Sequence, residues 1–108
     1  MKFATFLLFT ALLYGTVAAQ SACVIDTPSP PRQCTFAVVS WEGCAVPVTV
    51  EVLESPGGEV IDGPFPSDGT EFAWLARFSA GTNVDFRLTD ATGAIAQSGI
   101  ITIRPGRT

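Results

Sequence analysis

The acidic side chains are the residues of this sequence best suited to chemistry, because glycosidases use a pair of carboxylates as acid, base or nucleophile. The candidates for such a pair are Glu42, Glu51, Glu54, Asp62, Asp68, Glu71, Asp85 and Asp90. Most of them fall in expected turns or at solvent-facing strand positions, which indicates a solubilising role. Asp62, Asp68 and Asp90 also lack the alternating spacing of a calcium loop, so we expect no metal site.

Nucleophilic catalysis lacks its usual base in this chain. There is no histidine, and the single lysine, Lys2, lies at the extreme N-terminus. Without an imidazole no group can activate a cysteine thiolate, and Ser98 does not stand in a Gly-x-Ser-x-Gly elbow. We therefore expect a non-enzymatic protein with no catalytic residue and no cofactor.

Exposed aromatic side chains commonly form carbohydrate-binding faces, and five residues could supply one. These are Trp41, Phe65, Phe72, Trp74 and Phe78. Phe72, Trp74 and Phe78 recur at even spacing on one strand face, which favours a core role. Trp41 ends its expected strand and is compatible with either role. Phe65 lies between two prolines in an expected loop, so it is the candidate binding residue, with a core plug as the equal alternative.

The three cysteines, Cys23, Cys34 and Cys44, predict one disulfide and one odd thiol. An extended segment between Cys34 and Cys44 would hold them roughly 23 Å apart at ~3.3 Å per residue, too far for a bond. A first strand antiparallel to that segment brings Cys23 toward Cys44, so we predict this pair. Pairing of Cys23 with Cys34 stays open if the proline-rich connection folds back. The odd thiol is either a buried structural cysteine or the link of a disulfide-bonded dimer; otherwise we expect a monomer.

The N-terminal residues have the three parts of a secretory signal peptide. Lys2 is followed by an apolar run from Phe3 to Tyr14 and by small residues that end at Ala19. A run of 12 residues is short for a helix that must cross ~30 Å of hydrocarbon, which argues against a membrane anchor. We predict a signal peptide over residues 1–19 and a single domain over residues 20–108.

Removal of that segment leaves an acidic protein. Five arginines face ten acidic residues, a net charge of −5. Nucleic-acid affinity rests largely on lysine and arginine contacts to phosphates, so we expect no nucleic-acid partner. Residues 103–108 form no hydrophobic tail, so we expect no membrane anchor at this end.

Hydrophobic alternation with period two predicts an all-β protein. It is clearest over residues 46–54, where Val46, Val48, Val50 and Val52 share one face. About seven strands are expected, over residues 23–26, 35–41, 46–54, 59–61, 71–78, 84–89 and 94–103. Turn clusters separate them about every ten residues, as in an antiparallel sandwich. Gly99 indicates a bulge in the last strand, and residues 27–32, rich in proline, form an exposed crossover.

Several short motifs resemble a fungal extracellular domain, and together they span about residues 23–103. They are Cys34-x6-Trp41-x-Gly43, Pro56-Gly57-Gly58, Asp68-Gly69-Thr70-x-Phe72-x-Trp74, Ala80-Gly81-Thr82 and Leu88-x-Asp90-x-Thr92-Gly93-x3-Gln97-Ser98. The domain is the Ig-like N-terminal module of yeast cell-wall synthesis proteins and of Ser/Thr-rich GPI-anchored proteins. Cys23 and Cys44 are not part of that pattern, and the Ser/Thr-rich stalk and GPI tail are missing.

The resemblance implies an Ig-like β-sandwich, an extracellular or cell-wall location and no known catalytic residues. For some members it implies a role in β-1,6-glucan assembly. We therefore expect a secreted, non-catalytic protein that organises cell-wall glucan, with wall polysaccharide as its partner. The alternative is a freely secreted effector or inhibitor-like protein that binds an extracellular protein.

Overall fold

The computed structural model describes residues 22–56 and 58–106, which form eight strands and no helix. The strands are β1 (Val24–Asp26), β2 (Phe36–Glu42), β3 (Val48–Glu54), β4 (Glu59–Ser67), β5 (Glu71–Leu75), β6 (Asn83–Thr89), β7 (Ile95–Gln97) and β8 (Ile101–Thr102). The predicted signal peptide lies outside the described residues. In the described part, no helix is long and apolar enough to cross a membrane.

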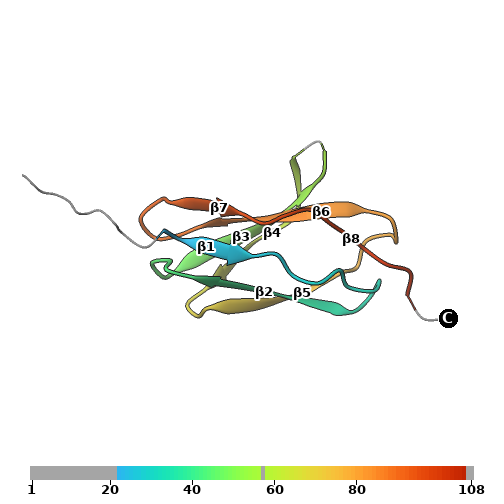
Figure 1. Ribbon diagram of the computed structural model, residues 1–108, viewed down its shortest axis with the longest axis horizontal. Helices are drawn as coiled ribbons and strands as arrows, with labels where there is room; N and C mark the ends of the chain where they lie inside the picture. Colours follow the sequence, from blue (N-terminus) through green and yellow to red (C-terminus); the bar gives the residue numbers. More distant parts are fainter. Residues whose placement is uncertain (1–21, 57, 107–108) are drawn as a thin grey trace, which may run out of the picture.

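The strands form two antiparallel sheets packed face to face (Figure 1). The first sheet has the order β1-β2-β5, and the second has the order β4-β3-β6-β7, with β8 also paired to β6. In the immunoglobulin constant arrangement the first sheet has four strands. Here it has three, because β4 pairs with β3 in the second sheet. The predicted all-β sandwich is confirmed.

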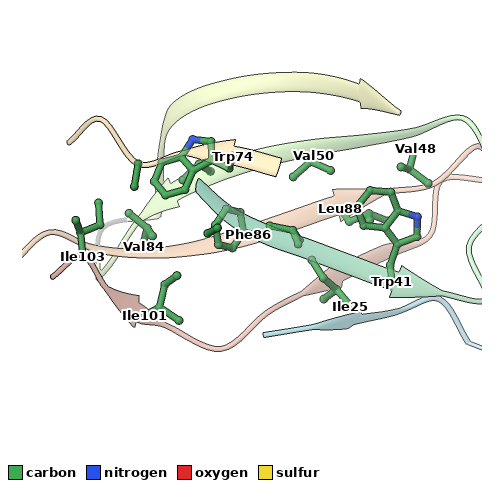
Figure 2. Packing of buried hydrophobic residues seen from close by; sticks show 14 residues of the cluster. Ile25, Trp41, Val48, Val50, Trp74, Val84, Phe86, Leu88, Ile101 and Ile103 are labelled. Carbon is green, nitrogen blue, oxygen red and sulfur yellow. The ribbon is translucent and has the colours of Figure 1, made fainter. Parts of the chain in front are cut away.

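The core between the sheets is built from the inward faces of the strands (Figure 2). Val48, Val50 and Val52 of β3 are fully buried, as their alternation predicts. The rings of Trp74 in β5 and Phe86 in β6 pack in a T-shaped arrangement with centroids 5.4 Å apart. The expectation for Val46 is wrong, because the strand begins at Val48 and the Val46 side chain is 50% exposed.

Strand β4 is longer than the three residues that the sequence predicts. It continues through Pro64 and Pro66 to Ser67, over residues expected to form a loop and a turn. Proline lacks the N–H group that a central strand needs, but an edge strand tolerates it. β4 is such an edge, and its pairing with β3 shifts register on either side of Val52.

The last predicted strand is split into β7 and β8 at the position where the sequence indicates a bulge. Ala96 packs against the core from one side of the break, and Ile101 is buried on the other side. In a regular strand, residues on one face are an even number of positions apart, but these two inward residues are an odd number apart. The break therefore shifts the alternation of inward and outward side chains by one residue. For this reason Ile95 is 64% exposed, although its spacing from Ile101 predicts an inward side chain.

The proline-rich crossover links β1 to β2, both strands of the first sheet, and on the way it passes along the C-terminal segment that follows β8. β1 pairs with β2 up to Asp26, which lies opposite Ser40. The chain then leaves β2 and runs beside the C-terminal segment, where Arg32 and Arg104 form a parallel bridge (Figure 1). Gln33 N–H donates to the Arg104 carbonyl at 2.8 Å. The crossover therefore leaves part of β2 without a neighbour on this side.

Candidate functional site

Phe65, the candidate binding residue of the sequence, lies in β4 rather than in a loop. Its side chain is half-buried, packs against the core and stacks on Phe72 with ring centroids 4.8 Å apart. A contact role for Phe65 remains a prediction. Trp41 is 3% exposed and its indole N–H donates to the Gly69 carbonyl at 3.0 Å, which resolves its role as core.

The buried carboxylates of the described residues are engaged in structural hydrogen bonds. Asp62 accepts from the Trp74 indole N–H at 2.9 Å and from the Arg77 guanidinium at 2.9 Å. Asp85 accepts from the Gln97 amide at 2.9 Å. Buried polar groups are stabilising only when they are paired, so these contacts account for both residues.

Asp90 closes the turn between β6 and β7 and joins it to the loop before β3. It accepts from Thr92 Oγ1 at 2.6 Å and from the backbone N–H groups of Ala45, Thr92 and Ala94. These bonds, led by the Thr92 hydroxyl, stabilise the carboxylate and lower the pKa of Asp90 from 3.8 to about 2. A carboxylate held in this form by a turn is suited to fastening loops and not to proton transfer.

The cysteines divide as the sequence predicts. Cys23 and Cys44 form a disulfide between the start of β1 and the residues that follow β2. Cys34 is free and exposed at the start of β2, so its interpretation as a buried structural thiol is wrong.

A hollow of about 430 Å³ lies on the side of β2 that β1 leaves open. We call it the β2-edge notch; its lining consists of Ser29, Pro30, Pro31, Arg32, Thr35, Phe36, Ala37, Val38 and Arg104. One wall is the crossover and the other is the first half of β2.

The notch combines apolar side chains with positive charge. Phe36 and Val38 point away from the core and are 63% and 52% exposed. Arg32 and Arg104 line the same hollow, and within residues 22–56 and 58–106 neither forms a salt bridge. The guanidinium of Arg104 donates instead to the Pro30 carbonyl at 3.1 Å, which fixes its position at the rim.

Two features of the sequence indicate this surface, although neither led to a prediction of it. The run Phe36-Ala37-Val38-Val39 is apolar at successive positions, so one strand face must expose apolar groups if the other is core. The prolines at 28 and 30 show that β1 ends early. Arg104 is remote in sequence, and only the tertiary structure places it beside Phe36.

Comparison with known proteins identifies the fold and no family. No protein-family model matches the chain, and no curated protein matches it. The chain is similar to titin module A71 from human cardiac muscle, with 21% identity and a TM-score of 0.50, over 78% of this chain and 94% of that one. This likeness supports a sandwich of the immunoglobulin and fibronectin kind and does not extend to function.

Two further solved structures have lower similarity. CopC from Methylosinus trichosporium OB3b has 17% identity and a TM-score of 0.43, over 76% of this chain and 89% of that one. The twitchin kinase region from C. elegans has 25% identity and a TM-score of 0.40, over 68% of this chain and 15% of that one. At these scores neither structure supports an inference about activity or ligand.

Proposed function

We propose that this protein is a secreted, non-catalytic interaction module that binds an extracellular protein through the β2-edge notch. The observation that carries the proposal is the combination, in one hollow, of exposed Phe36 and Val38 with Arg32 and Arg104, which form no salt bridge to any residue that the structure describes. Phenylalanine, like the other aromatic residues, and arginine are enriched at protein interfaces relative to the rest of the surface.

Two features support secretion. The N-terminal sequence has the composition of a signal peptide, and Cys23 and Cys44 form a disulfide, which persists in oxidising compartments. The absence of histidine from the chain and the structural engagement of Asp62, Asp85 and Asp90 support a non-catalytic role.

Organisation of fungal cell-wall glucan is the second candidate function. It is motivated by the resemblance to the wall-protein module and by one exposed aromatic ring, Phe36. Sugar-binding faces generally use larger aromatic surfaces, and both tryptophans of this chain are buried. This difference is our reason for ranking a protein partner first.

The test compares two charge substitutions at exposed apolar residues. Phe36→Glu places a carboxylate in the notch, whereas Ile95→Glu places one on β7, outside the residues that line it. The secreted wild-type protein and both variants are used as baits in the culture fluid of the producing cells. We expect a protein partner that wild type and Ile95→Glu retain and that Phe36→Glu loses by at least about tenfold, because a hot-spot residue contributes about 2 kcal/mol or more.

The same three proteins are sedimented with insoluble β-1,3-glucan and β-1,6-glucan. Retention on glucan that depends on Phe36, without a protein partner, would replace the first candidate by the second. If no protein is retained, or if the partner binds Phe36→Glu as well as it binds Ile95→Glu, the proposed function is wrong.

A further inference from the structure

The backbone of β2 has a free edge inside the notch. Trp41 N–H donates to the Thr70 carbonyl, so its backbone faces β5. Backbone groups alternate in direction along a strand, so those of Phe36 and Val38 face the opposite side. β1 occupies that side only at Ser40–Glu42, and within the described residues no group bonds to the backbone of Phe36 or Val38 there.

The sequence explains why β1 does not continue along this edge. Asp26 lies opposite Ser40, so the same register would place Pro28 opposite Val38 and Pro30 opposite Phe36. These are positions at which the two strands exchange N–H···O bonds. Proline has no N–H to donate, so the chain leaves the edge of β2 here and runs beside the C-terminal segment before β2 begins.

We infer that the β2-edge notch binds an extended peptide segment of the partner protein, which adds to the sheet as a strand beside Phe36 and Val38. This inference rests on the proposed function and names the form of its ligand. Two N–H groups and two carbonyls stand free along the edge, enough to pair with about three peptide residues in an antiparallel ladder. Addition of a strand to an exposed edge is a recurrent mode of peptide recognition.

The side chains of the notch indicate the composition of that segment. Phe36 and Val38 lie on the outer face of the sheet, where alternate apolar residues of an added strand would pack beside them. Arg32 and Arg104 at the rim favour an acidic residue next to the apolar positions. A second copy of this chain fits less well, because pairing of two β2 edges would bring the arginines of both copies together.

The test uses capped peptides and ¹⁵N-labelled secreted protein. The probe is the peptide Asp-Asp-Val-Thr-Val-Thr-Val-Asp-Asp, and a version with lysine in place of aspartate is its charge control. Free protein should show fast hydrogen exchange at Phe36 and Val38 and slow exchange at Val39, whose backbone faces β5. The aspartate peptide should slow exchange at Phe36 and Val38, and the lysine peptide should bind more weakly.

Two substitutions at Val38 separate strand addition from contact by side chains alone. Val38→Pro removes an N–H group that has no partner in the free protein, whereas Val38→Thr keeps that group and the branched shape. We expect Val38→Pro to bind the aspartate peptide about tenfold more weakly and Val38→Thr to bind within about twofold of wild type. Melting curves and the NMR spectrum verify that both variants fold, and a variant that does not fold is replaced by wild type with a peptide N-methylated at alternate amides.

The backbone amides of Phe36 and Val38 report whether a strand is added to β2. Strand addition is supported by peptide-dependent protection at Phe36 and Val38 that Val38→Pro or N-methylation abolishes. It is overturned if the aspartate peptide does not bind at millimolar concentration, if Val38→Pro or the N-methylated peptide binds normally, or if the free protein already protects these amides as an edge-to-edge dimer. A protein partner that Phe36→Glu loses and Val38→Pro retains would leave the proposed function standing and remove strand addition.

Discussion

A single carboxylate can stabilise a turn by accepting hydrogen bonds from backbone N–H groups that have no partner in a strand. Asp90 accepts four hydrogen bonds in a turn whose chain reverses between β6 and β7, and one of its donors, Ala45, belongs to a different loop. Such turns depend on an acceptor side chain because their N–H groups have no ladder partner. Asp90 is therefore expected to influence stability in a pH-dependent way.

We predict that acid destabilises the wild type more than Asp90→Asn. The pKa of Asp90 is lowered to about 2 in the folded protein, so the unfolded chain takes up the proton first, near 3.8. The stabilisation is present above 3.8 and is lost as the pH falls toward 2. Urea unfolding at several pH values should show Asp90→Asn less stable at neutral pH, with the difference narrowing in acid. If the free energy of unfolding falls equally with pH in wild type and in Asp90→Asn, the lowered pKa of Asp90 is contradicted.

At the scale of the elements, the edge strands determine which backbone N–H and C=O groups of each sheet remain open for further pairing. β4 carries two prolines, and its pairing with β3 shifts register beside Gly63, so the outer edge of the second sheet is irregular. On the first sheet, β1 ends before it covers Phe36 and Val38, and an open edge remains. Proline thus has opposite effects at the two edges. In β4 the prolines make the edge irregular and hinder further pairing, whereas after β1 they end the strand and leave the edge of β2 open.

We predict that Gly63→Ala destabilises the protein more than Gly58→Ala. Both glycines have positive φ, +97° and +74°, so alanine is strained by about 1–2 kcal/mol at either position. At Gly63 the added Cβ would also lie 2.9 Å from the Val50 carbonyl oxygen, whereas at Gly58 nothing lies within 4 Å. Denaturant unfolding should give at least about 1 kcal/mol more loss for Gly63→Ala. Equal losses would show that β4 adapts freely at Gly63.

At the scale of the whole molecule, the four arginines of residues 22–56 and 58–106 fall into two kinds, two in salt bridges and two at the notch. Arg77 and Arg87 are paired with Asp62 and Glu51 at 2.9 Å and 2.7 Å, whereas Arg32 and Arg104 are drawn together at the notch. The Cys23–Cys44 disulfide links the start of β1 to the residues after β2, at the end of the β1–β2 pairing that lies away from the notch. One end of the first sheet is therefore closed covalently, and the other is open and basic.

We predict that the secreted protein begins at Gln20 and contains one intrachain disulfide. Intact mass should correspond to residues 20–108 less two hydrogens, and peptide mapping without reduction should join the peptides of Cys23 and Cys44. Alkylation without denaturant should label Cys34, because its side chain is exposed. A chain that begins at Met1, or a Cys34 linked to Cys23, would contradict this organisation.

Local pattern was sufficient for the all-β class and for most strands, because period-two alternation reports directly which face of a strand is buried. Val48, Val50 and Val52 illustrate this success. Local pattern also favoured the Cys23–Cys44 disulfide but left pairing of Cys23 with Cys34 open, and the structure decides for the first. The length of β4 depended on its position at the edge of a sheet, where prolines are tolerated. The exposure of Ile95 depended on the break between β7 and β8, which reverses the faces of the strand. Neither cause can be read from the neighbouring residues of the sequence. The notch required the tertiary structure, because it joins the crossover, β2 and Arg104 across some seventy residues of sequence. Only folding places the open backbone edge of β2, an exposed aromatic ring and two arginines in one hollow.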